Sequence, residues 1–130
     1  MNNSGKSALG LDANVAAGLC YLPVCAINII MPIIVIVTDQ TNKLARFHAF
    51  QSLLLLGAAL IIEIPAYFLM FILFLMNSTI TSILGGLFGL VLGVVGLAIF
   101  VFMIIALIKA FQGEIYKIPF IGDMADKWSN

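Results

Sequence analysis

The chain has 130 residues and no net charge; 63% of its residues are hydrophobic and 9% are charged. This composition excludes the basic surface of a nucleic-acid-binding protein and leaves almost no residues for a water-soluble domain. Three stretches without a polar face fill most of the sequence: Val15–Val37, Ala49–Met76 and Ile83–Ile108. As helices, all three would exceed the roughly 30 Å of a bilayer core. We therefore predict one all-α integral-membrane domain, residues 1–130, with three transmembrane helices.

The first stretch follows an amino-terminal segment whose charges are Lys6 and Asp12. It is longer than the apolar region of a signal peptide, so we expect it to be retained as a span, kinked at Pro23 and Pro32. An alternative breaks the chain at Pro23 into a re-entrant hairpin, giving four crossings. Each half of that hairpin would have about 14 residues, too few to cross unaided, so three full spans are preferred.

Cys20 and Cys25 lie five residues apart in this stretch and would face different directions on a helix. Because the chain has one histidine and no cysteine-rich cluster, no metal site or cofactor is expected. We predict two buried thiols that pack as small apolar side chains.

Basic residues indicate the orientation of the spans. Lys43 and Arg46 lie in the first connection, 38–48, and three lysines lie in the tail, 109–130, whereas the connection 77–82 carries no charge. Because cytoplasmic segments are enriched in Lys and Arg, the first connection and the carboxyl terminus are predicted to be cytoplasmic and the amino terminus outside. The expected location is the bacterial inner membrane.

Two polar side chains, Asn28 and Glu63, lie well inside their spans, about 13 and 21 Å from the cytoplasmic ends. One hypothesis is an intramembrane polar site for ion or substrate transit. The preferred alternative is a neutral glutamic acid that bonds Asn28 or a carbonyl freed by a proline and fixes the register of the helices.

A polar motif opens the second span at the cytoplasmic interface, with Arg46 able to reach lipid phosphates. His48, Gln51 and Ser52 follow at i, i+3 and i+4 and so form one stripe. His48 has no nucleophile or acid at the spacing of a catalytic pair, so we predict an anchor rather than an enzyme.

The third span carries glycines every four residues, Gly85, Gly89 and Gly93, with Gly96 beside them. A face without side chains lets another helix approach closely. The expected partner is the first or second span of this chain; self-association or a foreign subunit is the alternative.

The tail begins at Lys109, and Gly113 is placed to end the third helix. Pro119 should turn the chain into an amphipathic interfacial segment, whose Tyr116 and Trp128 are ring types that settle at headgroup level. Its apolar side chains are expected on the bilayer or against the His48 stripe: Ile121, Met124 and Trp128.

Two short motifs flank the second and third stretches: Arg46-Phe47-His48-Ala49-Phe50-Gln51, and Lys109-Ala110 followed by Gly113, Pro119, Gly122-Asp123 and Ala125-Asp126. In this order they resemble small bacterial membrane proteins related to the chloroplast inner-envelope protein-import component, over roughly residues 12–128. The resemblance implies a helical membrane protein whose plastid relatives contribute to preprotein translocation. It carries over motif residues without assigned chemistry: Arg46, His48, Gln51, Pro119 and Asp123.

The predicted function is a non-enzymatic membrane subunit or scaffold within a larger complex, with a link to protein translocation implied by the resemblance. Its expected partners are lipids and membrane-protein subunits or further copies of the chain, and no nucleic acid. The alternative is a self-associating channel or transporter lined by Asn28 and Glu63, because three spans can scarcely enclose a pathway alone.

Overall fold

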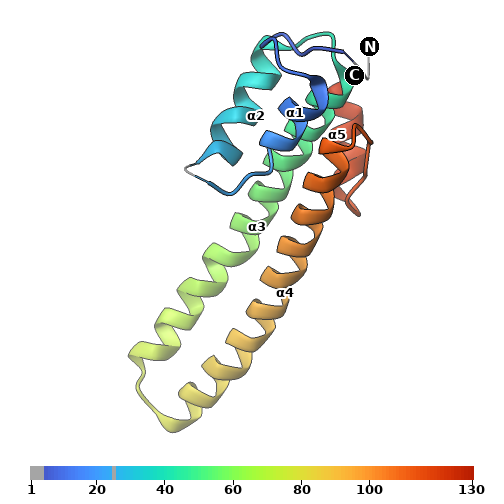
Figure 1. The fold of residues 1–130 in the computed structure, drawn as a ribbon. Helices are drawn as coiled ribbons and strands as arrows, with labels where there is room; N and C mark the ends of the chain where they lie inside the picture. Colours follow the sequence, from blue (N-terminus) through green and yellow to red (C-terminus); the bar gives the residue numbers. More distant parts are fainter. Residues whose placement is uncertain (1–4, 25) are drawn as a thin grey trace. The chain divides into compact units, whose positions relative to one another are not determined.

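The computed structural model describes residues 5–24 and 26–130. Their elements are all helices: α1 (Ala13–Leu19), α2 (Ile27–Thr38), α3 (Lys43–Leu75), α4 (Thr79–Phe111) and α5 (Ile121–Ser129) (Figure 1). The chain divides into two compact units, each described by itself below. The first unit comprises Met1–Leu55 and Phe102–Asn130, and the second comprises Leu56–Val101.

The predicted first span is not one helix. α1 ends at Leu19, and α2 starts at Ile27 after Ala26, whose φ is +60°. Pro23 lies in the interruption, where it has no amide hydrogen to continue a helix and its ring disfavours helical backbone in the preceding residue. At 12 residues, α2 rises only about 18 Å. The prediction of a continuous transmembrane helix over 15–37 is therefore wrong, and the break near Pro23 is the one that the four-crossing alternative assumed.

The first unit has a core of small side chains. Ala16, Cys20, Val35 and two alanines of α3 form a buried cluster, and α1 packs against α2. Cys20 is fully buried, as predicted, and burial raises the pKa of its thiol to about 12. The prediction for Cys25 falls outside the described residues. At Gly18 an added Cβ would lie 2.6 Å from the ring of Phe111, so α1 approaches the end of α4 closely.

α3 begins earlier than predicted. Asp39 Oδ1 accepts hydrogen bonds from the amides of Thr41 and Asn42, and Asn42 Oδ1 accepts one from the amide of Ala45. These side chains satisfy amides that a helix start leaves unpaired. The predicted connection 38–48 is thus helical from Lys43 onward, and Arg46 and His48 lie on the helix rather than in a loop.

The second unit holds the end of the α3–α4 hairpin that contains the turn, and its two helical segments run antiparallel (Figure 1). Asn77 adopts φ +44° in this turn, and Ser78 Oγ caps α4 by accepting the amide of Thr81 at 3.2 Å. Both helices are long and apolar enough to cross a membrane. The second and third predicted spans, 49–76 and 83–108, are confirmed as helices, extended to Lys43 and Phe111.

Candidate functional site

The candidate site lies in the first unit, where the start of α3 meets the segment that joins α4 to α5. We call this segment, residues 112–120, the strap; Figure 1 shows it leading out of α4. Gly113, at φ +76°, ends α4 as predicted. Its amide bonds the carbonyl of Ala110 at 3.0 Å and the amide of Glu114 bonds that of Lys109 at 2.9 Å. This paired pattern is the glycine-dependent helix ending in which a left-handed residue satisfies the last carbonyls.

Two side chains of α3 bind the backbone of the strap. His48 Nε2 lies 2.9 Å from the carbonyl oxygen of Glu114. Gln51 Nε2 donates to the carbonyl of Tyr116 at 2.9 Å, and Gln51 Oε1 accepts the amide of Ile118 at 3.0 Å. Every second residue of the strap from Glu114 to Ile118 is thereby bonded to one side of α3.

Tyr21, which follows α1, joins these two side chains. Its hydroxyl lies 3.0 Å from His48 Nδ1 and accepts a hydrogen bond from Gln51 Nε2 at 2.9 Å. The partners decide which atom donates in each hydrogen bond of His48. A carbonyl can only accept, so His48 Nε2 carries the proton, and the neutral ring then accepts the Tyr21 hydroxyl at Nδ1. The amide nitrogen of Gln51 must face the carbonyl of Tyr116 and its oxygen must face the amide of Ile118. Only one of the two flipped orientations of the glutamine amide therefore fits.

We call Tyr21, His48 and Gln51 the strap network. All three side chains are at most 1% exposed. Every polar atom of the three has a partner, and no buried side-chain nitrogen or oxygen in the described part of the chain lacks one. A fully satisfied buried network rigidifies the segments it joins, because an unpaired polar group there would be costly. Both nitrogens of the histidine are committed, so the arrangement holds the strap in place.

The predicted interfacial stripe is therefore buried rather than exposed at a membrane boundary, because the strap covers it. Ser52, its third member, bonds the carbonyl of Ala49 within α3 at 3.0 Å. Tyr21 was missed by the sequence reasoning. The available signal was a hydroxyl in an otherwise apolar stretch, close to the proline that ends the first helical segment.

Arg46 is also buried, at 9% exposure, so the prediction that it reaches lipid phosphates is wrong. Its Nη1 donates to the carbonyls of Ile36 and Asp39, at 3.2 and 3.0 Å, and to Gln40 Oε1 at 3.2 Å. Its Nε donates to the carbonyl of Ser129 at 3.4 Å. A planar guanidinium suits several acceptors at once. Arg46 therefore ties the end of α2 to the end of α5.

The helix α5 docks through a face of small residues, Gly122, Ala125 and Ser129, which are buried. Asp126 adds ion pairs with Lys117 at 2.8 Å and Lys43 at 3.0 Å. These two lysines hold the pKa of the Asp126 carboxyl below its usual range, Lys117 having the larger effect. Aromatic contact completes the docking, since the ring of Trp128 meets that of Phe50 edge-on at 6.3 Å.

The remaining predicted tail residues lie on or beside the strap. Lys109 pairs with Glu114 at 2.7 Å on the surface, and Asp123 pairs with Lys117 at 3.2 Å. The carbonyl of Pro119 accepts the amide of Ile121 at 2.9 Å in the turn before α5. The amphipathic character predicted for the tail thus belongs to the short helix α5.

The two polar residues predicted inside the spans lie in different units, Asn28 on α2 of the first and Glu63 on α3 of the second. Their pairing stays a prediction. Glu63 lies beside α4, with its Oε1 3.5 Å from the point where a Cβ on Gly96 would be.

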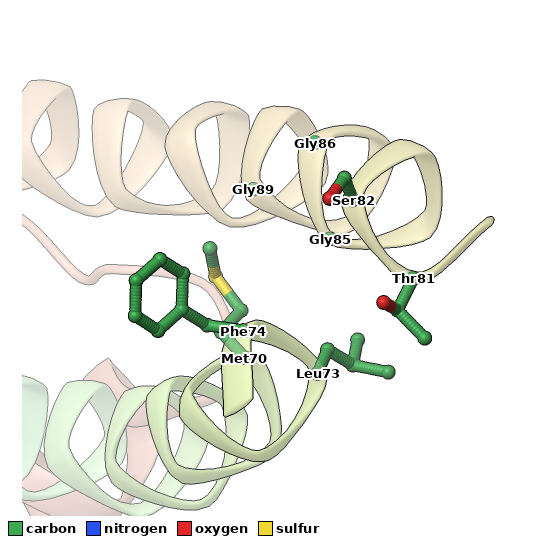
Figure 2. A pocket seen from close by; sticks show the side chains of 8 residues that line it. All are labelled: Met70, Leu73, Phe74, Thr81, Ser82, Gly85, Gly86 and Gly89. Carbon is green, nitrogen blue, oxygen red and sulfur yellow. The ribbon is translucent and has the colours of Figure 1, made fainter. Parts of the chain in front are cut away.

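The glycine face of α4 meets α3 at some positions and open space at others. A Cβ on Gly89 would lie 3.3 Å from Met70 Cε, whereas one on Gly85 or Gly93 would have no neighbour within 4 Å. Residues of both helices line a hollow of about 320 Å³ beside the turn of the hairpin. Figure 2 shows the side chain of Met70 directed toward the glycine face, with the ring of Phe74 beside it. Close backbone approach by another helix stays a prediction for this face.

Comparison with known proteins identifies the family. The family model described as the magnetosome magnetite crystal formation protein family matches residues 12–125. The chain belongs to this family. It is 33% identical over 126 residues to a UPF0132 membrane protein of Methanocaldococcus jannaschii, which covers 96% of each chain. A second UPF0132 membrane protein of that organism is 32% identical over 124 residues, or 93% of this chain and 73% of the relative. One from Archaeoglobus fulgidus is 26% identical over 117 residues, covering 90% and 95%. No solved structure matches.

These relatives correct the predicted resemblance. The matching family is not that of the chloroplast import component, and the relatives named above are archaeal, so the resemblance and its implied link with preprotein translocation are wrong. The structure gives the quoted motifs a packing role: Arg46, His48 and Gln51 bind the tail that carries the second motif. The chain is a small membrane protein, consistent with the names of its relatives and with its two long apolar helices.

Proposed function

We propose that this family member is a non-enzymatic membrane scaffold. In this proposal the α3–α4 hairpin crosses the bilayer, and the first unit forms a folded cap outside the hydrocarbon where α3 begins and α4 ends. The observation that carries the proposal is the strap network, in which every polar atom of Tyr21, His48 and Gln51 is used to hold backbone or one another. When all polar atoms of a motif bind the backbone or one another, the motif rigidifies the fold and has no group free to act on a substrate.

The dimensions of the second unit support the membrane crossing. Residues 56–75 of α3 and 79–101 of α4 would rise about 30 and 34 Å, close to the thickness of a bilayer core. Glu63 is the only charged residue between Leu56 and Val101. Large apolar side chains there are widely exposed, among them Ile61 at 76%, Phe74 at 78% and Leu90 at 70%. Contiguous exposure of this kind suits a lipid environment.

Two crossings would place both chain ends on the same side. All six Lys and Arg residues lie outside 56–101, and the turn of the hairpin carries no charge. The excess of positive residues then favours a cytoplasmic cap. In this topology the amino terminus lies on the same side as the carboxyl terminus, whereas three spans would have placed it outside. This topology replaces the three-span arrangement inferred from hydropathy.

The partners of a scaffold are lipids together with either other membrane proteins or further copies of the chain. The family's description names magnetosome magnetite crystal formation; the scaffold role is proposed independently of that process, because the strap network needs neither metal nor mineral. Crosslinking in native membranes, followed by purification in mild detergent, separates the classes of partner. A homo-oligomer that conducts ions would instead favour the channel alternative.

Site-directed spin labelling in lipid nanodiscs tests the proposal. Nitroxides at Ile61 and Leu90 should be accessible to oxygen, which dissolves in lipid, and protected from a water-soluble nickel chelate. A nitroxide at Leu9, in the first unit, should show the reverse and serves as the control. Nickel accessibility at Ile61 and Leu90 equal to that at Leu9 would refute the crossing.

A further inference from the structure

The outer face of α5 and the turn before it expose three large apolar side chains. Phe120 is 93% exposed, Trp128 48% and Met124 44%. We call these residues the apolar ridge. Met124 and Trp128 are four residues apart and therefore share one face of the helix. The opposite face, with Gly122 and Ala125, is buried against the rest of the first unit. Met124 thus points outward, and Trp128 leaves about half of its surface exposed while the edge of its ring contacts Phe50.

The path of the strap determines where the ridge lies along α3. Glu114 is bound at His48, while Tyr116 and Ile118 are bound at Gln51, about 4.5 Å further along α3 in the direction of Leu75. The strap therefore runs toward the start of the uninterrupted apolar sequence of α3 at Leu53.

The helix α5 then contacts earlier residues of α3. Asp126 pairs with Lys43, and the carbonyl of Ser129 accepts Arg46 Nε. The turn that contains Phe120 directly follows Ile118, whose bond to Gln51 lies further along α3 than the contacts of Asp126, Trp128 and Ser129.

The backbone holds Phe120 in an exposed and unfavourable conformation. Its φ is +67°, a region that side-chain-bearing residues rarely adopt. The turn is fixed on both sides, by the amide of Ile118 on Gln51 and by the amide of Gly122 on the carbonyl of Ile118 at 2.7 Å. Strained backbone of this kind persists only where the surrounding structure holds it, and it is concentrated at functional sites. Here the hydrogen bonds on both sides of the turn hold the exposed ring of Phe120 in place.

We propose that the apolar ridge inserts into the interfacial layer of the same bilayer that α3 and α4 cross. This inference rests on the proposed function, since it takes the hairpin to be transmembrane. The occupant of the surface is lipid because the turn that carries Phe120 follows the strap toward Leu53, where the apolar sequence of α3 begins, and because tryptophan is a side chain that favours the headgroup level. The two acids of α5, Asp123 and Asp126, are both paired with Lys117, at 3.2 and 2.8 Å, so the helix brings no unpaired carboxylate to the lipid.

Fluorescence quenching by brominated lipids tests the insertion, because Trp128 is the only tryptophan of the chain. The wild type and three single-tryptophan variants are reconstituted in vesicles of neutral lipids brominated either near the headgroup or near the chain ends. Each variant combines Trp128→Phe with one reporter: Phe120→Trp on the ridge, Leu90→Trp on the hairpin or Leu9→Trp in the amino-terminal segment of the first unit. Trp128→Phe keeps an aromatic ring against Phe50.

The expected result is a loss of emission at residues 120 and 128 with lipids brominated near the headgroup, while Leu9→Trp stays unquenched. Leu90→Trp should be quenched with either lipid or more strongly by bromine near the chain ends. Quenching at residue 90 with none at residues 120 and 128 would overturn the ridge and leave the hairpin intact. Blue-shifted but unquenched emission at residue 120 would also overturn it, since protein would then cover the ridge. An unquenched residue 90 would refute the transmembrane hairpin itself.

Discussion

Replacing Gln51 with leucine should release the strap from α3. The glutamine side chain makes three hydrogen bonds of 2.9 to 3.0 Å, two of them to the backbone of Tyr116 and Ile118. Leucine has a similar size but bonds neither group, and the amide of Ile118 is left unpaired in a buried position. A buried polar group without its partner costs about 1–3 kcal/mol, so the two backbone groups together should cost about 3 kcal/mol. The fraction of molecules with the strap open should rise roughly 100-fold.

Trypsin cleavage after Lys117 measures this opening directly. Lys117 is exposed, but the next residue, Ile118, is 3% exposed and bonded through its amide, so cleavage must follow local opening. When opening is fast, the cleavage rate follows the open population. The matched control is Gln112→Leu, at the exposed glutamine that begins the strap, which should change stability by less than about 0.5 kcal/mol. Equal cleavage rates for Gln51→Leu and the wild type would refute the account of the strap network.

Three further outcomes are expected of the first unit. Arg46→Lys should lower the free energy of unfolding by about 1–3 kcal/mol, because an ammonium cannot serve the acceptors of the guanidinium together; an unchanged unfolding midpoint would argue against this role. The pKa of Asp126 is lowered from 3.8 by its lysine partners, so its stabilising effect is present above that pH and is lost as the pH falls further. Acid should therefore undock α5 and shift Trp128 emission, and Asp126→Asn should remove the pH dependence of that shift. Gly18→Ala should destabilise by about 1–3 kcal/mol because its Cβ would meet the ring of Phe111, whereas Gly57→Ala, with open space around it, should be neutral or stabilising in the same thermal melt.

Sequence reasoning predicted the long helices well because their signal is local. An uninterrupted apolar stretch of more than twenty residues leaves few alternatives to a helix, and α3 and α4 follow that pattern. The same reasoning failed over 15–37, where mean hydropathy is high but Pro23 interrupts the helix. Hydropathy measures the preference for lipid and is insensitive to a single residue that lacks an amide hydrogen.

The sequence singled out the site residues on α3 but neither Tyr21 nor the segments that these residues bind. Arg46, His48 and Gln51 were recognised as a polar group on one helix, but the bonds by which they hold the tail go to backbone atoms 65 to 83 positions away in sequence. Every residue has a backbone carbonyl, and every residue except proline has an amide hydrogen, so no sequence pattern singles out the ones that a glutamine will bind. The wrong family resemblance rested on the same short motifs. Because these residues serve packing, they carry little information on function.

The two-crossing hairpin is tested most directly by the sidedness of the chain ends. Short tags at the amino and carboxyl termini would be probed from outside sealed cells, alongside a cysteine at Asn77 in a chain with Cys20 and Cys25 replaced by serine. Two crossings predict that both tags are equally protected and that the cysteine reacts with an impermeant maleimide. An exposed amino-terminal tag with a protected carboxyl-terminal tag would establish an odd number of crossings and contradict the account.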